Sequence, residues 1–157
     1  MVMSTRLVAY FSATGVTEGK AREIADAVGG DLYEIVPAVR YSSADLDWMN
    51  KQSRSSVEMN DPECRPEIAG ELPDCSGYDS VVIGYPIWWY TAPKIIRTFL
   101  ERADLKGKRI DLFATSGSSG IGKSVEELQK DYPELQIVSG KLVNKRIDAA
   151  DIRVWLA

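Results

Sequence analysis

Short, nearly continuous runs of apolar residues recur along the chain, and polar turns separate them. Runs that lack alternation of apolar and polar positions are typical of strands buried on both faces of a parallel sheet. One further run, at residues 31–36, alternates better and suits a strand at the edge of a sheet. The pattern therefore predicts an edge strand there and buried strands at residues 7–11, 80–83, 110–114 and 135–138.

The stretches between these runs carry apolar residues three and four positions apart, which predicts amphipathic helices. The residues that form these apolar faces are Ala21, Ile24, Ala25, Val28, Ile95, Ile96, Phe99, Leu100, Val125 and Leu128. Asp148 and Asp151 resemble a helix cap, which predicts a last helix that buries Ile152, Trp155 and Leu156. Because strands and helices alternate, we expect an α/β fold with helices on both faces of a parallel sheet.

Residues 37–73 break this alternation. The segment is polar, carries Pro, Asn, Asp and Ser, and contains only a short helix-like piece around residues 46–59. We expect it to be a long excursion over one edge of the sheet. We see no internal repeat or flexible linker, and 157 residues suit one domain, so we expect a single domain over residues 1–157.

Composition and charge narrow the class of protein. With 45% apolar and 27% charged residues, the chain is close to the average for soluble globular proteins. No apolar stretch approaches the roughly 18 to 20 residues that cross a bilayer, and the first residues do not resemble a signal peptide. We therefore expect a cytoplasmic protein without a membrane partner. The net charge of −4 argues against a nucleic-acid partner and leaves basic protein partners possible.

The chain has no histidine, which excludes Ser-His-Asp and Cys-His catalysis. Cys64 and Cys75 could pair, but in a cytosolic protein they are more often free thiols, and they predict no metal site. We therefore expect no catalytic side chain. Any chemistry must come from a bound cofactor.

Polar and aromatic residues gather where three of the predicted strands end, which is where ligands bind in open α/β sheets. Residues 12–17 read SATGVT and precede a helix, so their hydroxyls and free backbone N–H groups suit a phosphate. They could also be a simple helix cap. Residues 84–93 place aromatic side chains between prolines, which indicates a surface for a planar ligand, or merely the end of the strand. Residues 115–122 carry glycines and hydroxyls that could reach polar ring edges.

Residues 117–124 read GSSGIGKS, which fits the phosphate loop G-x-x-x-x-G-K-[ST] of nucleotide triphosphatases. That loop follows an early strand, and a later strand must end in an Asp that binds Mg²⁺. Too few residues follow Ser124 to form the rest of such a sheet, and no apolar strand among them ends in Asp. We therefore do not expect an ATP site. Lys123 is more simply a solvated residue near the start of a helix.

Together, the three loops resemble those of the flavodoxins, and more closely those of a flavodoxin-like group of short chains. This group carries [ST]-x-T-G-x-[ST], G-x-P-x-W and T-S-G-x-S-G-x-G after the corresponding strands. The resemblance covers residues 6–156. It implies a flavodoxin-like three-layer sandwich, with a five-stranded parallel sheet in the order 2-1-3-4-5 and FMN at its carboxyl edge. Position by position, it implies that Ser12, Thr14, Gly15, Val16 and Thr17 hold the FMN phosphate, that Pro86, Ile87, Trp88 and Trp89 border the isoalloxazine, and that Thr115, Ser116 and Gly117 reach its polar edge.

Two positions depart from the family pattern. Val16 stands where Asn is common, which removes a side-chain donor, and the third loop lacks the Tyr that many flavodoxins stack on the ring, which suggests that one ring face is open.

The resemblance leaves two kinds of function open. In the first, an electron carrier passes electrons between redox protein partners. In the second, an FMN-dependent NAD(P)H:quinone-type oxidoreductase serves a small electron acceptor. The sequence has no G-x-G-x-x-G fingerprint, which favours the carrier, although flavin reductases of this fold can bind nicotinamide without it. The modest negative charge falls short of the strongly acidic surface usual in flavodoxins. A binding module without flavin is the third alternative.

Overall fold

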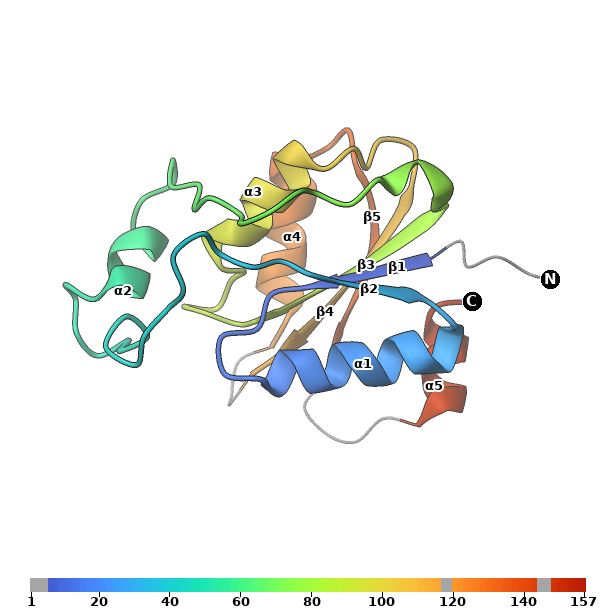
Figure 1. Cartoon of the computed structure of the whole chain (residues 1–157), viewed down its shortest axis with the longest axis horizontal. Helices are drawn as coiled ribbons and strands as arrows, with labels where there is room; N and C mark the ends of the chain where they lie inside the picture. The colour runs from blue at the N-terminus through green and yellow to red at the C-terminus, as the bar shows by residue number, and fades with distance from the viewer. Residues whose placement is uncertain (1–5, 117–119, 144–147) are drawn as a thin grey trace.

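A computed structural model describes residues 6–116, 120–143 and 148–157. Its centre is a five-stranded parallel sheet in the order β2-β1-β3-β4-β5 (Figure 1). This order confirms the predicted topology. The strands are β1 (Arg6–Tyr10), β2 (Asp31–Glu34), β3 (Ser80–Pro86), β4 (Arg109–Thr115) and β5 (Gln136–Leu142).

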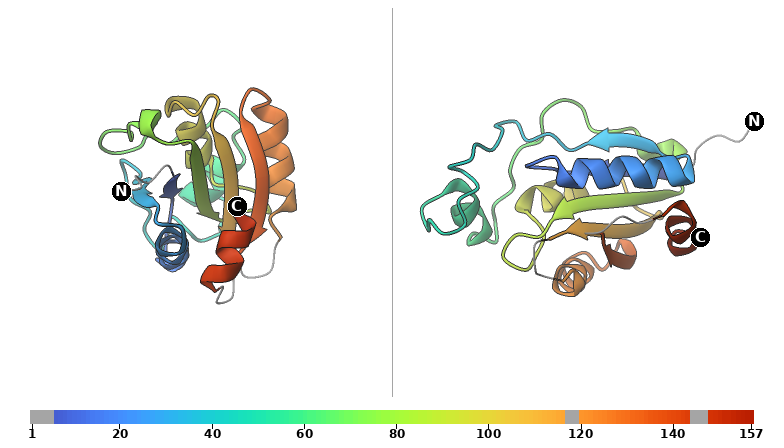
Figure 2. Two further views of the ribbon diagram at one scale, coloured as in Figure 1. Left: turned by 90° about the vertical axis from the view of Figure 1, so that its right-hand side faces the viewer. Right: turned by 90° about the horizontal axis from the view of Figure 1, so that it is seen from below.

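Helices cover both faces of the sheet, as predicted. The helices α1 (Val16–Val28) and α5 (Ala149–Trp155) lie side by side on one face, and α3 (Lys94–Arg102) and α4 (Gly122–Asp131) cover the other (Figures 1 and 2). Asp148 caps α5, because its carboxylate accepts a hydrogen bond from the N–H of Asp151 at 2.9 Å. The result is the three-layer sandwich expected from the sequence.

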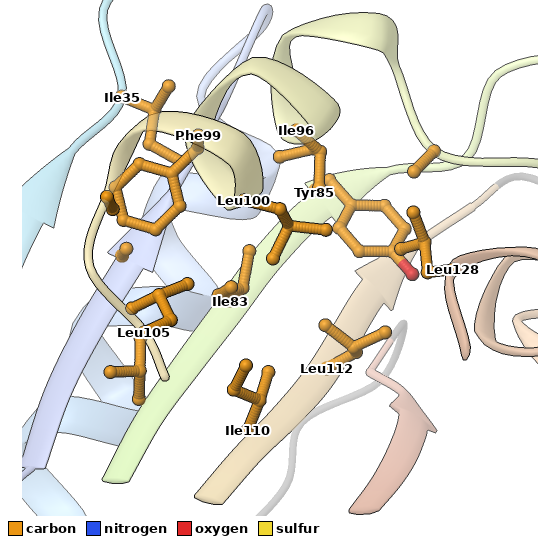
Figure 3. Packing of buried hydrophobic residues seen from close by; sticks show 14 of the residues in the cluster. Ile35, Ile83, Tyr85, Ile96, Phe99, Leu100, Leu105, Ile110, Leu112 and Leu128 are labelled. Carbon is orange, nitrogen blue, oxygen red and sulfur yellow. The ribbon is translucent and has the colours of Figure 1, made fainter. Parts of the chain in front are cut away.

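Each face of the sheet has its own apolar core. The larger core packs α3 and α4 against the sheet and contains Ile83, Ile96, Phe99, Leu112 and Leu128 (Figure 3). The smaller core, under α1 and α5, contains Val8, Ile24, Val82, Phe113 and Ile152. Alternate residues of each central strand therefore reach opposite cores, which explains why those strands read as continuous apolar runs.

The expectation for residues 135–138 was wrong in one respect. This run does not form a strand buried on both faces, because β5 is the second edge of the sheet and its Val138 side chain is 54% exposed. The strand continues through polar residues to Leu142, and its exposure alternates along the chain as expected at an edge. The apolar run alone did not show where this strand lies in the sheet.

The excursion, residues 37–73, follows the expectation in part. Its returning part lies beside the edge strand β2, where the Tyr33 hydroxyl donates to the carbonyl oxygen of Glu71, but the rest extends beyond the sheet. It leaves the edge strand β2, and Pro37 and Ile68 form an antiparallel bridge just beyond the end of β2. The segment then projects past the carboxyl ends of the strands (Figures 1 and 2). Its helix α2 (Arg54–Met59) is shorter than predicted and starts after Ser53, whose hydroxyl accepts a hydrogen bond from the N–H of Ser56. The excursion is therefore close to the predicted site.

The strand register brings the predicted loops to one level. Tyr10 of β1 pairs with Gly84 of β3, and Pro86 of β3 pairs with Thr115 of β4. Gly84 is required here, because a Cβ atom at this position would lie 2.0 Å from the ring of Phe113. The loops after β1, β3 and β4 therefore begin side by side, at the carboxyl ends of three adjacent strands.

Within the described residues, no helix is long and apolar enough to cross a membrane. Cys64 and Cys75 are free thiols.

Candidate functional site

The first loop, residues 12–17, connects β1 to α1 and presents the amino end of that helix. Gly15 precedes the helix with a φ of 95°, a left-handed conformation that favours glycine. Its N–H donates to the Ser12 hydroxyl at 3.0 Å. No described side chain caps α1, so the N–H groups of its first turn and the positive end of its dipole are available to an anion. Thr14 and Val16 are exposed beside them.

Hydrogen bonds join this loop to the two others. The Thr17 hydroxyl lies 2.8 Å from the Thr115 hydroxyl at the end of β4, and both side chains are buried. The N–H of Ile87, in the second loop, donates to the carbonyl oxygen of Thr115 at 2.9 Å. The three loops therefore form one connected unit centred on Thr115.

The second loop contains a strained turn. Trp88 and Thr91 each donate a backbone hydrogen bond to the other at 2.9 Å, which closes a two-residue turn over Trp89 and Tyr90. These two residues have φ values of 49° and 67°, as the central residues of a type I′ turn require, although such positions favour Gly, Asn and Asp. Bulky residues held in this way often mark a functional site.

The turn determines how far each aromatic ring is exposed. Trp89 is 36% exposed and Tyr90 is 64% exposed, whereas Trp88 is half-buried. The Trp88 ring lies edge-on to Phe11, with centroids 5.6 Å apart, and to Tyr41, with centroids 5.3 Å apart. Trp88 is therefore packed into an aromatic cluster, while Trp89 and Tyr90 are open to a ligand or partner.

Tyr41 is the member of this cluster that sequence reasoning missed. It comes from the excursion, and its ring also contacts Phe11 at a centroid distance of 5.7 Å. Burial and a hydrogen bond from its hydroxyl to Glu58 raise the pKa of Tyr41. The sequence signal was weak: Tyr41 is one of two aromatic residues in a polar segment, and Arg54 and Glu58 follow it four positions apart on a helix.

The third loop follows β4. Thr115 is buried and Ser116 is half-buried, while Gly117 lies outside the described residues. The triphosphatase-like octapeptide, residues 117–124, runs from this loop into the first turn of α4. Lys123 is exposed in the first turn of α4, as predicted, whereas Ser124 is fully buried. The Ser124 hydroxyl lies 2.8 Å from the Tyr85 hydroxyl and donates to the carbonyl oxygen of Ile121 at 2.8 Å, so it is not placed to bind Mg²⁺.

Comparison with known proteins assigns the chain to a protein family. A family described as Flavodoxin matches residues 5–157. The chain belongs to the flavodoxin family. No curated protein matches it.

Solved structures agree with this assignment to the flavodoxins. A candidate flavoprotein from Bacteroides eggerthii is 57% identical, with a TM-score of 0.94 over 98% of this chain and 96% of that chain. A candidate flavoprotein from Bacteroides uniformis is 48% identical, with a TM-score of 0.92 over 98% and 97% of the two chains. A Lactobacillus acidophilus flavoprotein, crystallised in complex with FMN, has the same fold at 21% identity, with a TM-score of 0.75 over 99% and 100%.

Proposed function

We propose that this flavodoxin binds FMN at the carboxyl edge of its sheet and carries electrons between redox proteins. Residues of the first loop would hold the phosphate: Ser12, Thr14, Gly15, Val16 and Thr17. Residues of the second loop would border the ring: Pro86, Ile87, Trp88 and Trp89. Thr115, Ser116 and Gly117 would reach the polar edge of the ring.

The amino end of α1 is the observation that carries the proposal. Its first-turn N–H groups have no side-chain cap among the described residues, and Gly15 turns the chain so that Thr14 lies exposed beside them. Backbone N–H groups and hydroxyls at a helix dipole suit a phosphate dianion. Aromatic side chains on the adjacent loop suit a planar ring. The residues therefore fit both ends of FMN.

When bound, FMN would supply the ability to accept and release electrons, and the protein would bind, orient and shield it. The hydrogen bonds through Thr115 keep the phosphate loop and the aromatic loop in a fixed relation, so both ends of a ligand would meet preformed partners. The cluster formed by the buried Phe11 and the half-buried Tyr41 and Trp88 would exclude water from one side of the site.

The exposed pair Trp89 and Tyr90 supports a second candidate function. Two aromatic rings held open beside the site could accept a planar small molecule, as an NAD(P)H:quinone-type oxidoreductase would require. The carrier remains the first proposal because the chain has no dinucleotide fingerprint.

The first test is titration of the cofactor-free protein with FMN, FAD and riboflavin, followed by visible absorbance and fluorescence quenching. We expect FMN to bind more tightly than FAD, since a loop that encloses a terminal phosphate leaves little room for an adenylate. A protein that binds none of these flavins would refute the proposal.

Stopped-flow reduction of the FMN-loaded protein then separates the two functions. A carrier should be reduced slowly by free NADPH and quickly by a flavoprotein reductase, at a rate that falls as salt rises. Saturable reduction by NADPH alone at about 10 per second or faster would instead support the oxidoreductase.

A further inference from the structure

We propose that Tyr41, from the excursion, is a positioning residue that fixes the indole of Trp88 at the cofactor site. This inference rests on the proposed FMN site. It gives the long, polar excursion a role in that site, which the three strand-end loops alone do not show.

Two aromatic neighbours, which also contact each other, hold the Trp88 ring. Phe11, which follows β1, meets it at an interplanar angle of 87°, and Tyr41 meets it at 74°. Edge-to-face pairs of this kind are favourable beyond their buried area. The backbone of Trp88 is fixed as well, by its paired hydrogen bonds with Thr91. Without Tyr41, one of these two aromatic contacts would be lost from a side chain that is only half-buried.

Tyr41 is itself fixed by α2. The guanidinium of Arg54 lies over the Tyr41 ring, 3.8 Å from its centroid. The Tyr41 hydroxyl donates to Glu58, and Glu58 also accepts from Arg54 at 2.9 Å. Arg54 and Glu58 are four residues apart on α2, so one helix face presents both partners. A second hydrogen bond from Arg54, to the carbonyl oxygen of Val39 at 2.6 Å, ties the helix to the first residues of the excursion.

The expected effect of Tyr41 on the cofactor is indirect. Tyr41 would not add a contact to FMN; it would raise the fraction of molecules in which Trp88 already has its binding orientation. The apparent dissociation constant rises in proportion as this fraction falls. Loss of Tyr41 should therefore weaken FMN binding by no more than loss of Trp88 itself.

A double-mutant cycle tests this dependence. We expect Tyr41→Leu to weaken FMN by about tenfold when Trp88 is present, and by less than about twofold in a Trp88→Leu background. Tyr41→Phe keeps the ring and should restore most of the affinity. The matched control is Tyr33→Leu, because Tyr33 is also a half-buried tyrosine, stacked on Phe99 in the core at 5.9 Å. It should lower stability without changing FMN affinity.

Two results would overturn the proposal: wild-type affinity in Tyr41→Leu, or an equal loss in both backgrounds. Near-ultraviolet circular dichroism of the cofactor-free protein gives a readout that does not depend on FMN. Tyr41→Leu should remove the tryptophan bands that Trp88→Leu removes. If the wild-type protein binds no FMN, the proposed function fails, and retained bands in Tyr41→Leu would separately refute the positioning of Trp88.

Discussion

The two ends of the parallel sheet both carry polar residues, but those residues are used in opposite ways. At the amino end, the carboxylate of Asp111 on β4 is fully buried and accepts hydrogen bonds from Arg109 at 2.9 Å and from the Ser139 hydroxyl at 2.5 Å. Ser139 in turn accepts from the indole of Trp155 at 3.0 Å. Polar groups there bond to other groups of the protein.

The same end also anchors the chain terminus. Arg6 donates to the carbonyl oxygen of Leu156 at 2.8 Å, and Arg109 donates to that of Ala157 at 2.7 Å. At the carboxyl end, by contrast, Thr14 is exposed, α1 has no side-chain cap among the described residues, and the Trp89–Tyr90 turn is strained. The amino end therefore satisfies its polar groups within the protein, whereas the carboxyl end leaves helix N–H groups and an exposed hydroxyl available to a ligand.

The largest expected effect is on stability and comes from a substitution at the amino end of the sheet. Asp111→Ala removes a fully buried carboxylate, to which Arg109 and Ser139 both donate hydrogen bonds. We therefore expect the free energy of unfolding to fall by about 3 kcal/mol. Urea denaturation of the cofactor-free protein measures this. FMN affinity of the folded variant should stay unchanged.

The control for this change is Glu18→Ala. Glu18 pairs with Arg22 at 2.8 Å, but the two side chains are 37% and 59% exposed, so its loss should cost no more than about 1 kcal/mol. Equal losses of stability in the two variants would contradict the view of Asp111 as a buried structural partner.

The next effect concerns the carboxyl end. Thr14→Ala should weaken FMN binding by about 2 kcal/mol, because it would remove the proposed charge-assisted hydrogen bond to the phosphate. It should leave stability almost unchanged, since Thr14 is exposed. Isothermal titration with FMN and with riboflavin, which lacks the phosphate, measures the effect. Thr14→Ser should retain most of the affinity.

Equal losses of FMN and riboflavin affinity in Thr14→Ala would show that this hydroxyl does not meet the phosphate. Thr17 is less suited to this test, because its hydroxyl is buried against Thr115, and its loss would also remove the hydrogen bond between the two loops.

A smaller effect, of opposite sign, concerns the strained turn. Replacing Trp89 and Tyr90 together by Asn and Gly should stabilise the cofactor-free protein by about 1 kcal/mol, because Asn-Gly suits a type I′ turn. Thermal unfolding measures this gain. Under the proposed function, the variant should also react more slowly with a redox protein partner, since the exposed rings are gone. A loss of stability would mean that the two rings contribute more by packing than the turn costs in strain.

Much of the fold could be predicted from the sequence, because strand and helix periodicities depend on local apolar spacing. The register of Tyr10 with Gly84 and of Pro86 with Thr115 is known only from the structure, because apolar runs do not determine how two parallel strands align. The edge position of β5 could not be read in this way, since Leu135–Val138 looks as apolar as a buried strand. Only tertiary packing shows that Val138 faces solvent.

In the candidate site, too, the features that depend on local sequence could be predicted and those that depend on distant residues could not. The helix amino end at Gly15 could be predicted because glycine and hydroxyl residues after a strand have a local meaning. The contact between Tyr41 and Trp88 joins residues far apart in the chain, and no local pattern encodes it. The left-handed backbone of Trp89 and Tyr90 could not be predicted either, because residue preference argues against it.

The smallest expected effect tests the triphosphatase-like octapeptide at the carboxyl end. Lys123→Ala should leave FMN affinity and stability unchanged, within about 0.5 kcal/mol, because Lys123 is exposed on the first turn of α4. In a phosphate loop the serine after the lysine binds Mg²⁺. Here the Ser124 hydroxyl is buried and already bonds to Tyr85 and to the carbonyl oxygen of Ile121. Phosphate release from ATP with and without Mg²⁺ is the measurement, and Lys130→Ala, a second exposed lysine of α4, is the matched control. Magnesium-dependent hydrolysis that disappears in Lys123→Ala but not in Lys130→Ala would show that the octapeptide is a nucleotide site. The carboxyl end of the sheet would then bind a nucleotide in addition to the proposed FMN.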